Sequence, residues 1–389
     1  MKKLVLFLIV IAAAGYLTYQ YSPEAREIAA DWIANYLGTD AESTAETVSK
    51  TEPAAPQPTK KPKKRVQKVL KPGPFDRLDR IAKNTSAAEE KSMENLVQYL
   101  VSKGGSETEK ARLIFTWIAT HIKYDDQSYN SKNYADMSAQ GVFKRRAGVC
   151  EGYSNLVLEM CSLAGLECKK VIGYSKGYGY QLGARFTETD HAWNIIKTNG
   201  KWGLYDATWA AGYGETVKGK LKSTMEFDDY WFNVKPEEFL FTHFPENPNW
   251  LFTSSKYTLA DFENLPYARK SFFKLGFDAQ KAIGFNGKGK VNEFTSTYSL
   301  KYPLKIVKAP YVKQLPNNRT YEIVLESEYM DDIQLLNGKD WIPFEKNGNS
   351  FSVKVKPQLG SLKVLAKAHS WENTYPTAME YEVVDVNAL

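Results

Sequence analysis

Apolar residues recur at helical spacing in the first half of the chain. After Ser106 they return every three or four positions, and Glu109 follows Ser106 by three residues, the pattern of a capping box at a helix start. The same pattern at Ser86 predicts another helix start there. A further helix is predicted to begin at Cys150 and to end near Gly165, since glycine suits the left-handed turn after a helix.

The pattern then changes to that of strands. The segment DHAWNIIKTNGKWGLYDATW predicts two strands joined at Asn199-Gly200, a strong signal for a two-residue hairpin turn. With this turn Trp193 lies directly opposite Asp206, and His191 directly opposite Thr208. Because side chains alternate across a strand, His191 shares one face with Trp193. We therefore expect His191 and Asp206 to be diagonal neighbours, with roughly 7–8 Å between their backbones.

The last hundred residues alternate between apolar and polar positions in short runs such as TYEIVLESE and SFSVKVKP. The turn signals Asn337-Gly338 and Asn347-Gly348 separate some of these runs. We therefore predict an antiparallel β-sandwich over residues 291–389. Residues 256–290 are interpreted as a connector that leads into it.

An apolar run from Leu4 to Leu17 follows the short basic start of the chain. Its length fits the core of a signal peptide better than a membrane span of about 20 residues, and Ala12-Ala13-Ala14 offers a cleavage site. We predict that residues 1–21 are a signal peptide, with an uncleaved membrane anchor as the alternative. Either way, the protein is expected in the periplasm, outside the cell, or anchored in a membrane and facing outward.

Two segments separate this run from the first globular pattern. Residues 22–38 place apolar side chains on one face of a short predicted helix, which could lie on a membrane surface or dock on the folded part of the chain. Residues 39–74 lack aromatic residues and are rich in Ala, Thr, Pro and Lys, the composition of a disordered linker. The net charge of +6 is concentrated in the second half of this linker. The folded part is therefore close to neutral, and we expect no nucleic-acid partner.

The three cysteines are Cys150, Cys161 and Cys168. An odd number leaves at least one free thiol in an exported protein. Cys161 falls on the apolar face of the predicted helix, which indicates core packing, and a Cys161–Cys168 disulfide is the alternative. Cys150 lies where a loop meets a helix and has no such explanation.

Cys150, His191 and Asp206 have the chemical types of a nucleophile, a base and a residue that orients the base. A thiol reacts as the thiolate, which helix N-termini and a neighbouring imidazolium favour. A metal site at these residues is disfavoured, because the chain has only four histidines and no paired-ligand motif. The glycines of KGYGYQLG lack the strand and helix setting of a dinucleotide site, so we expect a loop and no cofactor.

Three blocks of the sequence, GVCEGYSNL, DHAWNII and GKWGLYDATW, resemble the transglutaminase-like superfamily. The segments KARLIFTWIATHIKYD and TLADFENLPYARKSFFKLGF are similar to its kyphoscoliosis-peptidase-like branch. The resemblance implies an α+β fold, with a papain-like catalytic core over residues 75–255 followed by an immunoglobulin-like sandwich. It maps nucleophile, base and orienting carboxylate onto Cys150, His191 and Asp206.

That family implies acyl transfer from a protein or peptide substrate, and we favour hydrolysis over transfer to an amine. Because export is expected, cell-wall peptides are one candidate substrate. The alternative is a tethered, non-catalytic scaffold or binding module that keeps the cleft.

Other residues of the site are less constrained by the pattern. The Cys150 backbone amide is expected to bind the oxyanion, with Gln140 as the candidate second donor. Trp193, Trp209 and Tyr178 are expected to line the substrate cleft.

Overall fold

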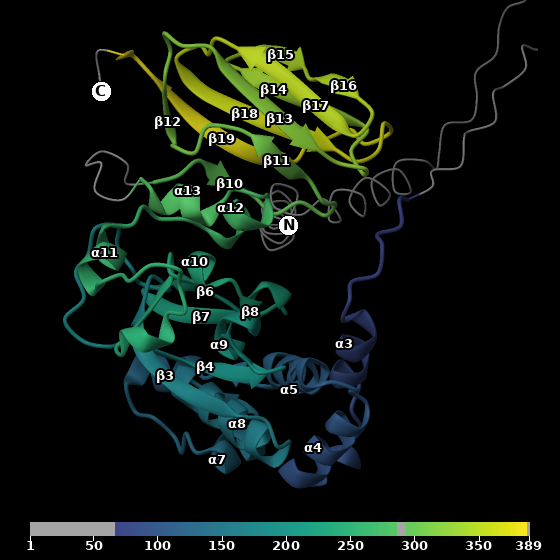
Figure 1. The fold of residues 1–389 in the computed structure, drawn as a ribbon, viewed down its shortest axis with the longest axis vertical. Helices are drawn as coiled ribbons and strands as arrows, with labels where there is room; N and C mark the ends of the chain where they lie inside the picture. The colour runs from purple at the N-terminus through teal and green to yellow at the C-terminus, as the bar shows by residue number, and fades with distance from the viewer. Residues whose placement is uncertain (1–66, 286–292, 387–389) are drawn as a thin grey trace, which may run out of the picture. The chain divides into compact units, whose positions relative to one another are not determined.

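The computed structural model describes residues 67–285 and 293–386, which form one compact unit. An α+β region is followed by an all-β region (Figure 1), as the sequence predicts. The predicted signal peptide or anchor, the predicted amphipathic helix and most of the predicted linker lie outside the described residues. Within the described residues, no helix combines the length and the apolar character needed to cross a membrane.

Helices make up most of the first part of the α+β region, and shorter ones follow later in the chain. The α-helices of this region are α3 (Asp76–Lys83), α4 (Met93–Ser102), α5 (Glu107–His121), α6 (Asp126–Ser131), α7 (Ala139–Arg145), α8 (Cys150–Leu163), α9 (Ala207–Ala210) and α10 (Pro236–Phe239). The 3₁₀ turns are η1 (Glu89–Lys91), η2 (Asp229–Trp231) and η3 (Pro248–Trp250).

A five-stranded antiparallel sheet forms the centre of this region, with the strand order β8-β5-β4-β3-β9. Helix α8 packs on β3 and β4 (Figure 1). Every residue of β4 except Lys197 is buried, because the strand is central and both of its faces are covered. The strands of the sheet are β3 (Cys168–Ser175), β4 (His191–Thr198), β5 (Lys201–Tyr205), β8 (Phe232–Val234) and β9 (His243–Pro245).

Two small paired elements lie outside this sheet. The strands β1 (Lys123–Tyr124) and β2 (Ala147–Gly148) pair in parallel just before α8. The strands β6 (Gly212–Val217) and β7 (Lys220–Met225) form a hairpin of their own.

The predicted hairpin turn is confirmed. Asn199 and Gly200 have φ angles of 52° and 75°, as a two-residue hairpin turn requires, and the register runs as predicted as far as Asn194 opposite Tyr205. Beyond that point the predicted pairs of Trp193 with Asp206 and of His191 with Thr208 are wrong. The strand stops because Asp206 becomes the N-cap of α9, its side chain accepting a hydrogen bond from the amide of Trp209.

The helix predictions have mixed outcomes. Ser106 and Glu109 form the capping box of α5, and α8 begins at Cys150 and is followed by Gly165 with φ 71°. The predicted helix start at Ser86 is wrong. Only the 3₁₀ turn η1 follows it, and the next α-helix begins at Met93 with Ser92 as its cap.

The C-terminal region consists of two sheets whose inner faces share one apolar core, as predicted for a β-sandwich. Gly338 and Gly348, with φ angles of 64° and 59°, lie in the predicted turns. One sheet contains β10 (Ser296–Thr297), β12 (Gln314–Pro316), β14 (Asp332–Asn337), β15 (Asp340–Pro343), β18 (Gly360–Lys367) and β19 (Thr377–Val384). The other contains β11 (Lys305–Lys308), β13 (Tyr321–Glu326), β16 (Glu345–Asn347) and β17 (Ser350–Val355).

The segment between the two regions contains the short helices α11 (Leu259–Asn264), α12 (Lys270–Lys274) and α13 (Ala279–Ile283). Its apolar side chains belong to the same core as those of the sandwich. Polar contacts join it to the α+β region. The buried Lys176 ammonium donates to the carbonyl oxygens of Phe262 and Leu265 at 2.7 and 3.0 Å, and Lys270 pairs with Asp228.

The ion pair between Arg112 of α5 and Asp79 of α3 is almost completely buried, with both N···O distances at 2.7 Å. Removal of one partner from such a pair leaves an uncompensated charge, at a cost of about 3–5 kcal/mol. We predict a loss of this size in the free energy of unfolding for Arg112→Met, measured by urea denaturation of the full chain. Lys197→Met, which breaks the ion pair with Glu167 in which both side chains are exposed, should cost at most about 1 kcal/mol. Equal losses in the two variants would contradict the prediction.

Candidate functional site

Cys150 is the first residue of α8, follows the N-cap Val149 and is half-buried. Its side chain lines a cleft of about 1150 Å³. The first amides of a helix have no partner within it and carry the positive end of the helix dipole. The Cys150 amide is therefore suited to bind an oxyanion that forms next to its own sulfur.

His191 and Asp206 lie beside Cys150, at the ends of the two strands that the Asn199-Gly200 turn connects. The Nε2 atom of His191 is 2.8 Å from Oδ2 of Asp206, and both side chains are buried. Because Nε2 is bonded to the carboxylate, Nδ1 is the ring nitrogen left for Cys150. The expected closeness of His191 and Asp206 is present, although the strand pairing that predicted it stops earlier.

Burial and charge act in opposite directions on this pair. Burial lowers the pKa of His191, but the negative charge of Asp206, the hydrogen bond to it and the interaction with Cys150 raise it to about 10. Burial raises the pKa of Asp206, yet the two histidines that contact it hold that pKa well below its usual range. The pair is thus an imidazolium and a carboxylate at neutral pH, and an imidazolium beside a thiol favours the thiolate.

Asp206 has a second histidine partner that the sequence pattern did not indicate. Nε2 of His243, at the start of β9, lies 3.0 Å from the same Oδ2 atom, and the His243 side chain is fully buried. His243 is 37 residues from Asp206 and reaches it only because β9 pairs with the outer side of β3. No local signal in the sequence could have found it.

The three side chains of His191, Asp206 and His243 also have the composition of a metal site. Two ligand atoms on a tetrahedral zinc ion, each about 2.0–2.1 Å from the metal, lie roughly 3.3 Å from each other. The two nitrogen-to-oxygen distances of 2.8 and 3.0 Å are shorter than this and fit hydrogen bonds. The residues therefore fit a network of hydrogen bonds better than a metal centre.

The walls of the cleft are rich in aromatic side chains. Trp209 lies beside His191, with ring centroids 5.6 Å apart, and Tyr178 projects from the loop after β3 and bonds Thr216 of the β6–β7 hairpin at 2.9 Å. Trp209 and Tyr178 thus both line the cleft, as expected. Residues before and after α12, such as Arg269 and Ser299, complete the rim.

Two other residues that the sequence analysis assigned to the site do not line the cleft. Trp193 is buried in the core under the site, with its ring against His243 and Phe239, and does not line the cleft. Gln140 lies exposed on α7 and does not line it either. The three cysteines are free, and Cys161 is in the core as expected.

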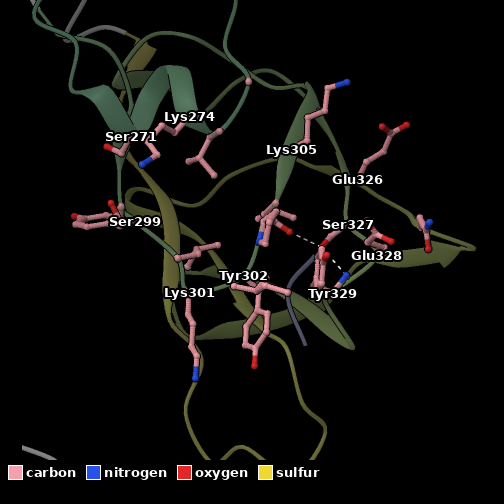
Figure 2. A pocket seen from close by; sticks show the side chains of 18 residues that line it. Ser271, Lys274, Ser299, Lys301, Tyr302, Lys305, Glu326, Ser327, Glu328 and Tyr329 are labelled. Atoms are coloured by element: carbon pink, nitrogen blue, oxygen red, sulfur yellow. Dashed lines mark hydrogen bonds between the residues drawn. The ribbon is translucent and has the colours of Figure 1, made fainter. Parts of the chain in front are cut away.

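A second hollow, of about 920 Å³, lies where α12 meets the sandwich (Figure 2). Lysine and glutamate side chains surround it, among them Lys274, Lys305 and Glu328. It shares Ser271, Tyr298 and Ser299 with the rim of the first cleft, but Cys150, His191 and Asp206 do not line it.

Residues 94–207 match the family model of the transglutaminase-like superfamily. Human kyphoscoliosis peptidase is 35% identical over 203 residues, which cover 52% of this chain and 30% of that protein. Hillarin of Drosophila melanogaster is 32% identical over 232 residues, covering 57% of this chain and 28% of that protein. The chain thus spans no more than about 30% of the length of these relatives.

A solved structure described as a TGase is 23% identical, with 32% of this chain and 34% of that chain covered and a TM-score of 0.24. That TM-score is too low to support a structural relationship. The similarity of this chain to the superfamily rests on the sequence matches.

The raised pKa of His191 predicts a pH dependence of stability. Below pH 6.5, about the pKa of a histidine in the unfolded chain, His191 is protonated in both the folded and the unfolded chain. Between pH 6.5 and about 10 it stays protonated only in the folded chain. The free energy of unfolding should therefore fall by up to about 1.4 kcal/mol per pH unit in this window. Urea denaturation between pH 7 and 9 measures the slope, and His191→Gln should lose most of it. Equal slopes in the variant and the unmodified chain would show that His191 does not hold this proton.

Proposed function

The chain belongs to the transglutaminase-like superfamily, and on that premise we propose that it is a cysteine-dependent acyl-transfer enzyme that acts on peptide or carboxamide bonds. The observation that carries the proposal is the buried His191–Asp206 ion pair beside Cys150 on an open cleft. A buried ion pair is costly for a fold and is a weak source of stability. Such a pair next to a thiol is the arrangement that activates a cysteine nucleophile.

In the first step the Cys150 thiolate attacks the carbonyl carbon of the substrate, and the carbonyl oxygen becomes an oxyanion. The Cys150 backbone amide, at the start of α8, donates a hydrogen bond to that oxygen. As the carbon–nitrogen bond breaks, the His191 imidazolium gives its Nδ1 proton to the leaving amine. A thioester on Cys150 and a neutral His191 remain.

In the second step an acceptor attacks the thioester carbon and loses its proton to His191. The carbon–sulfur bond breaks, and the thiolate and the imidazolium are restored. Throughout, Asp206 keeps its bond to Nε2, so that Nδ1 faces the reaction and the imidazolium is stabilised. Water as the acceptor gives hydrolysis, and an amine gives a cross-link.

We favour hydrolysis of a protein or peptide, because one relative is named a peptidase. The open cleft, with aromatic walls at Tyr178 and Trp209, has room for several residues of a peptide. Cell-wall peptides are one candidate class, which follows from the export predicted for residues 1–21. That export, and association with a membrane, stay predictions of the sequence.

We predict that Cys150→Ser lowers turnover at least about a thousandfold, because a hydroxyl at this position is not activated as a thiolate is. Cys168→Ser is the matched control, a free and half-buried cysteine that does not line the cleft, and it should retain activity within about twofold. The substrates are a casein digest, cell-wall peptides and glutaminyl peptides, each tested with and without a primary amine. Mass spectrometry follows both the products and a thioester on Cys150.

Cleavage of the substrates without incorporation of the amine supports the hydrolase. Incorporation supports the transglutaminase. If the folded protein turns over none of these substrates and forms no adduct at Cys150, the protein is better described as a scaffold that keeps the cleft as a binding surface.

A further inference from the structure

His243 has no role in the two chemical steps above, yet its ring is fully buried and held from several sides. Its side chain is fully buried, with Nε2 3.0 Å from Oδ2 of Asp206 and Nδ1 2.8 Å from the hydroxyl of Thr242. The ring stacks on Phe239 at 3.9 Å with an interplanar angle of 10°, and the edge of Trp193 meets it from another side. Both ring nitrogens thus have partners, and the plane of the ring is fixed.

These contacts decide where the proton of His243 lies. Burial lowers its pKa to about 4, the charge on Asp206 opposes this shift, and His191 adds to it. A neutral imidazole has one N–H group, and the nitrogen that faces the carboxylate must carry it. Nε2 therefore donates to Asp206. Nδ1 accepts the proton of the Thr242 hydroxyl at 2.8 Å, in preference to the more distant carbonyl oxygen of Phe239 at 3.3 Å.

Asp206 consequently accepts hydrogen bonds from three elements at once. His191 of β4 and His243 of β9 share Oδ2, and the Trp209 amide of α9 bonds Oδ1 at 2.9 Å. The carboxylate cannot rotate without breaking one of these bonds. His243 stabilises the anion with a neutral N–H group, so it adds no second positive charge to compete with the imidazolium of His191.

On the basis of the proposed function, we infer that His243 is a positioning residue of the triad. It fixes the carboxylate of Asp206, and it limits how strongly that carboxylate stabilises the protonated form of His191. An oxygen that accepts two hydrogen bonds binds each donor less tightly than an oxygen that accepts one. The limit matters because His191 must release its proton to the leaving amine in the first step. A carboxylate held by His191 alone would retain the proton more strongly.

Other titratable groups act on the same cluster and must be constant in any comparison. Cys150 interacts with His191, and burial and the charge of Asp206 raise the pKa of Tyr153 in α8. Asp190 directly precedes His191 at the start of β4. None of the substitutions below changes these three groups.

The test is a pH titration of the histidine rings by NMR, in the full chain labelled with ¹³C and ¹⁵N at histidine. The chain has four histidines, so the ring signals are few and can be assigned by single substitutions. In the unmodified protein, the nitrogen shifts of His243 should report an Nε2–H tautomer that stays neutral above pH 5. His243→Leu should move the titration midpoint of His191 upward by at least about half a pH unit. His243→Gln, whose amide can still donate to Asp206, should stay within about 0.2 units.

The inference is overturned if the His191 midpoint stays in place or falls in His243→Leu, or if the glutamine and leucine variants behave alike. Should His243→Leu fail to fold, Thr242→Val is compared with Thr242→Ser, since only the serine keeps the hydroxyl that orients the ring. The valine variant should then shift the midpoint upward and the serine variant should not, and equal midpoints overturn the inference. The titration needs no substrate, so a failed search for turnover leaves this test intact.

Discussion

The arrangement of the α+β region depends on one buried carboxylate, that of Asp206. A carboxylate removed from water costs several kcal/mol unless hydrogen bonds replace its hydration. Here the replacements come from β4, β9 and α9, which the chain brings together only when the sheet is complete. The cost of burial is therefore offset in the native fold and not in a partly assembled one. The His191–Asp206 ion pair thus favours one arrangement of the strands in this region.

The contacts of the site that the sequence could predict are those between residues close together in the chain. His191 and Asp206 belong to one hairpin, and the register of a hairpin follows from its turn, so the sequence predicts their closeness. His243 belongs to the outermost strand of a five-stranded sheet. Its neighbour β3 comes early in the chain, and no periodicity or turn signal specifies that pairing.

The other differences also have physical reasons. Alternation along β4 places Trp193 on the same face as His191. Because a central strand is covered on both faces, two side chains on one face need not both reach the cleft, and Trp193 is buried. Ser86 has the pattern of a capping box, yet the residues after it make only a 3₁₀ turn before Ser92 starts α4. Local patterns therefore predicted which elements form more reliably than where they begin and which surface they present.

Lys176 links the cleft to the segment that follows the α+β region. It lines the cleft beside the site, and its ammonium bonds two carbonyl oxygens at the end of α11. The stretch that the family model recognises, residues 94–207, contains Cys150 and its two partners but neither His243 nor α11. The family model therefore ends before the residues that hold Asp206 and Lys176 in place, whereas the matches to the two relatives extend over 203 and 232 residues. A fragment cut at residues 94 and 207 would keep Cys150, His191 and Asp206 but would lose His243 and the contact between Lys176 and α11.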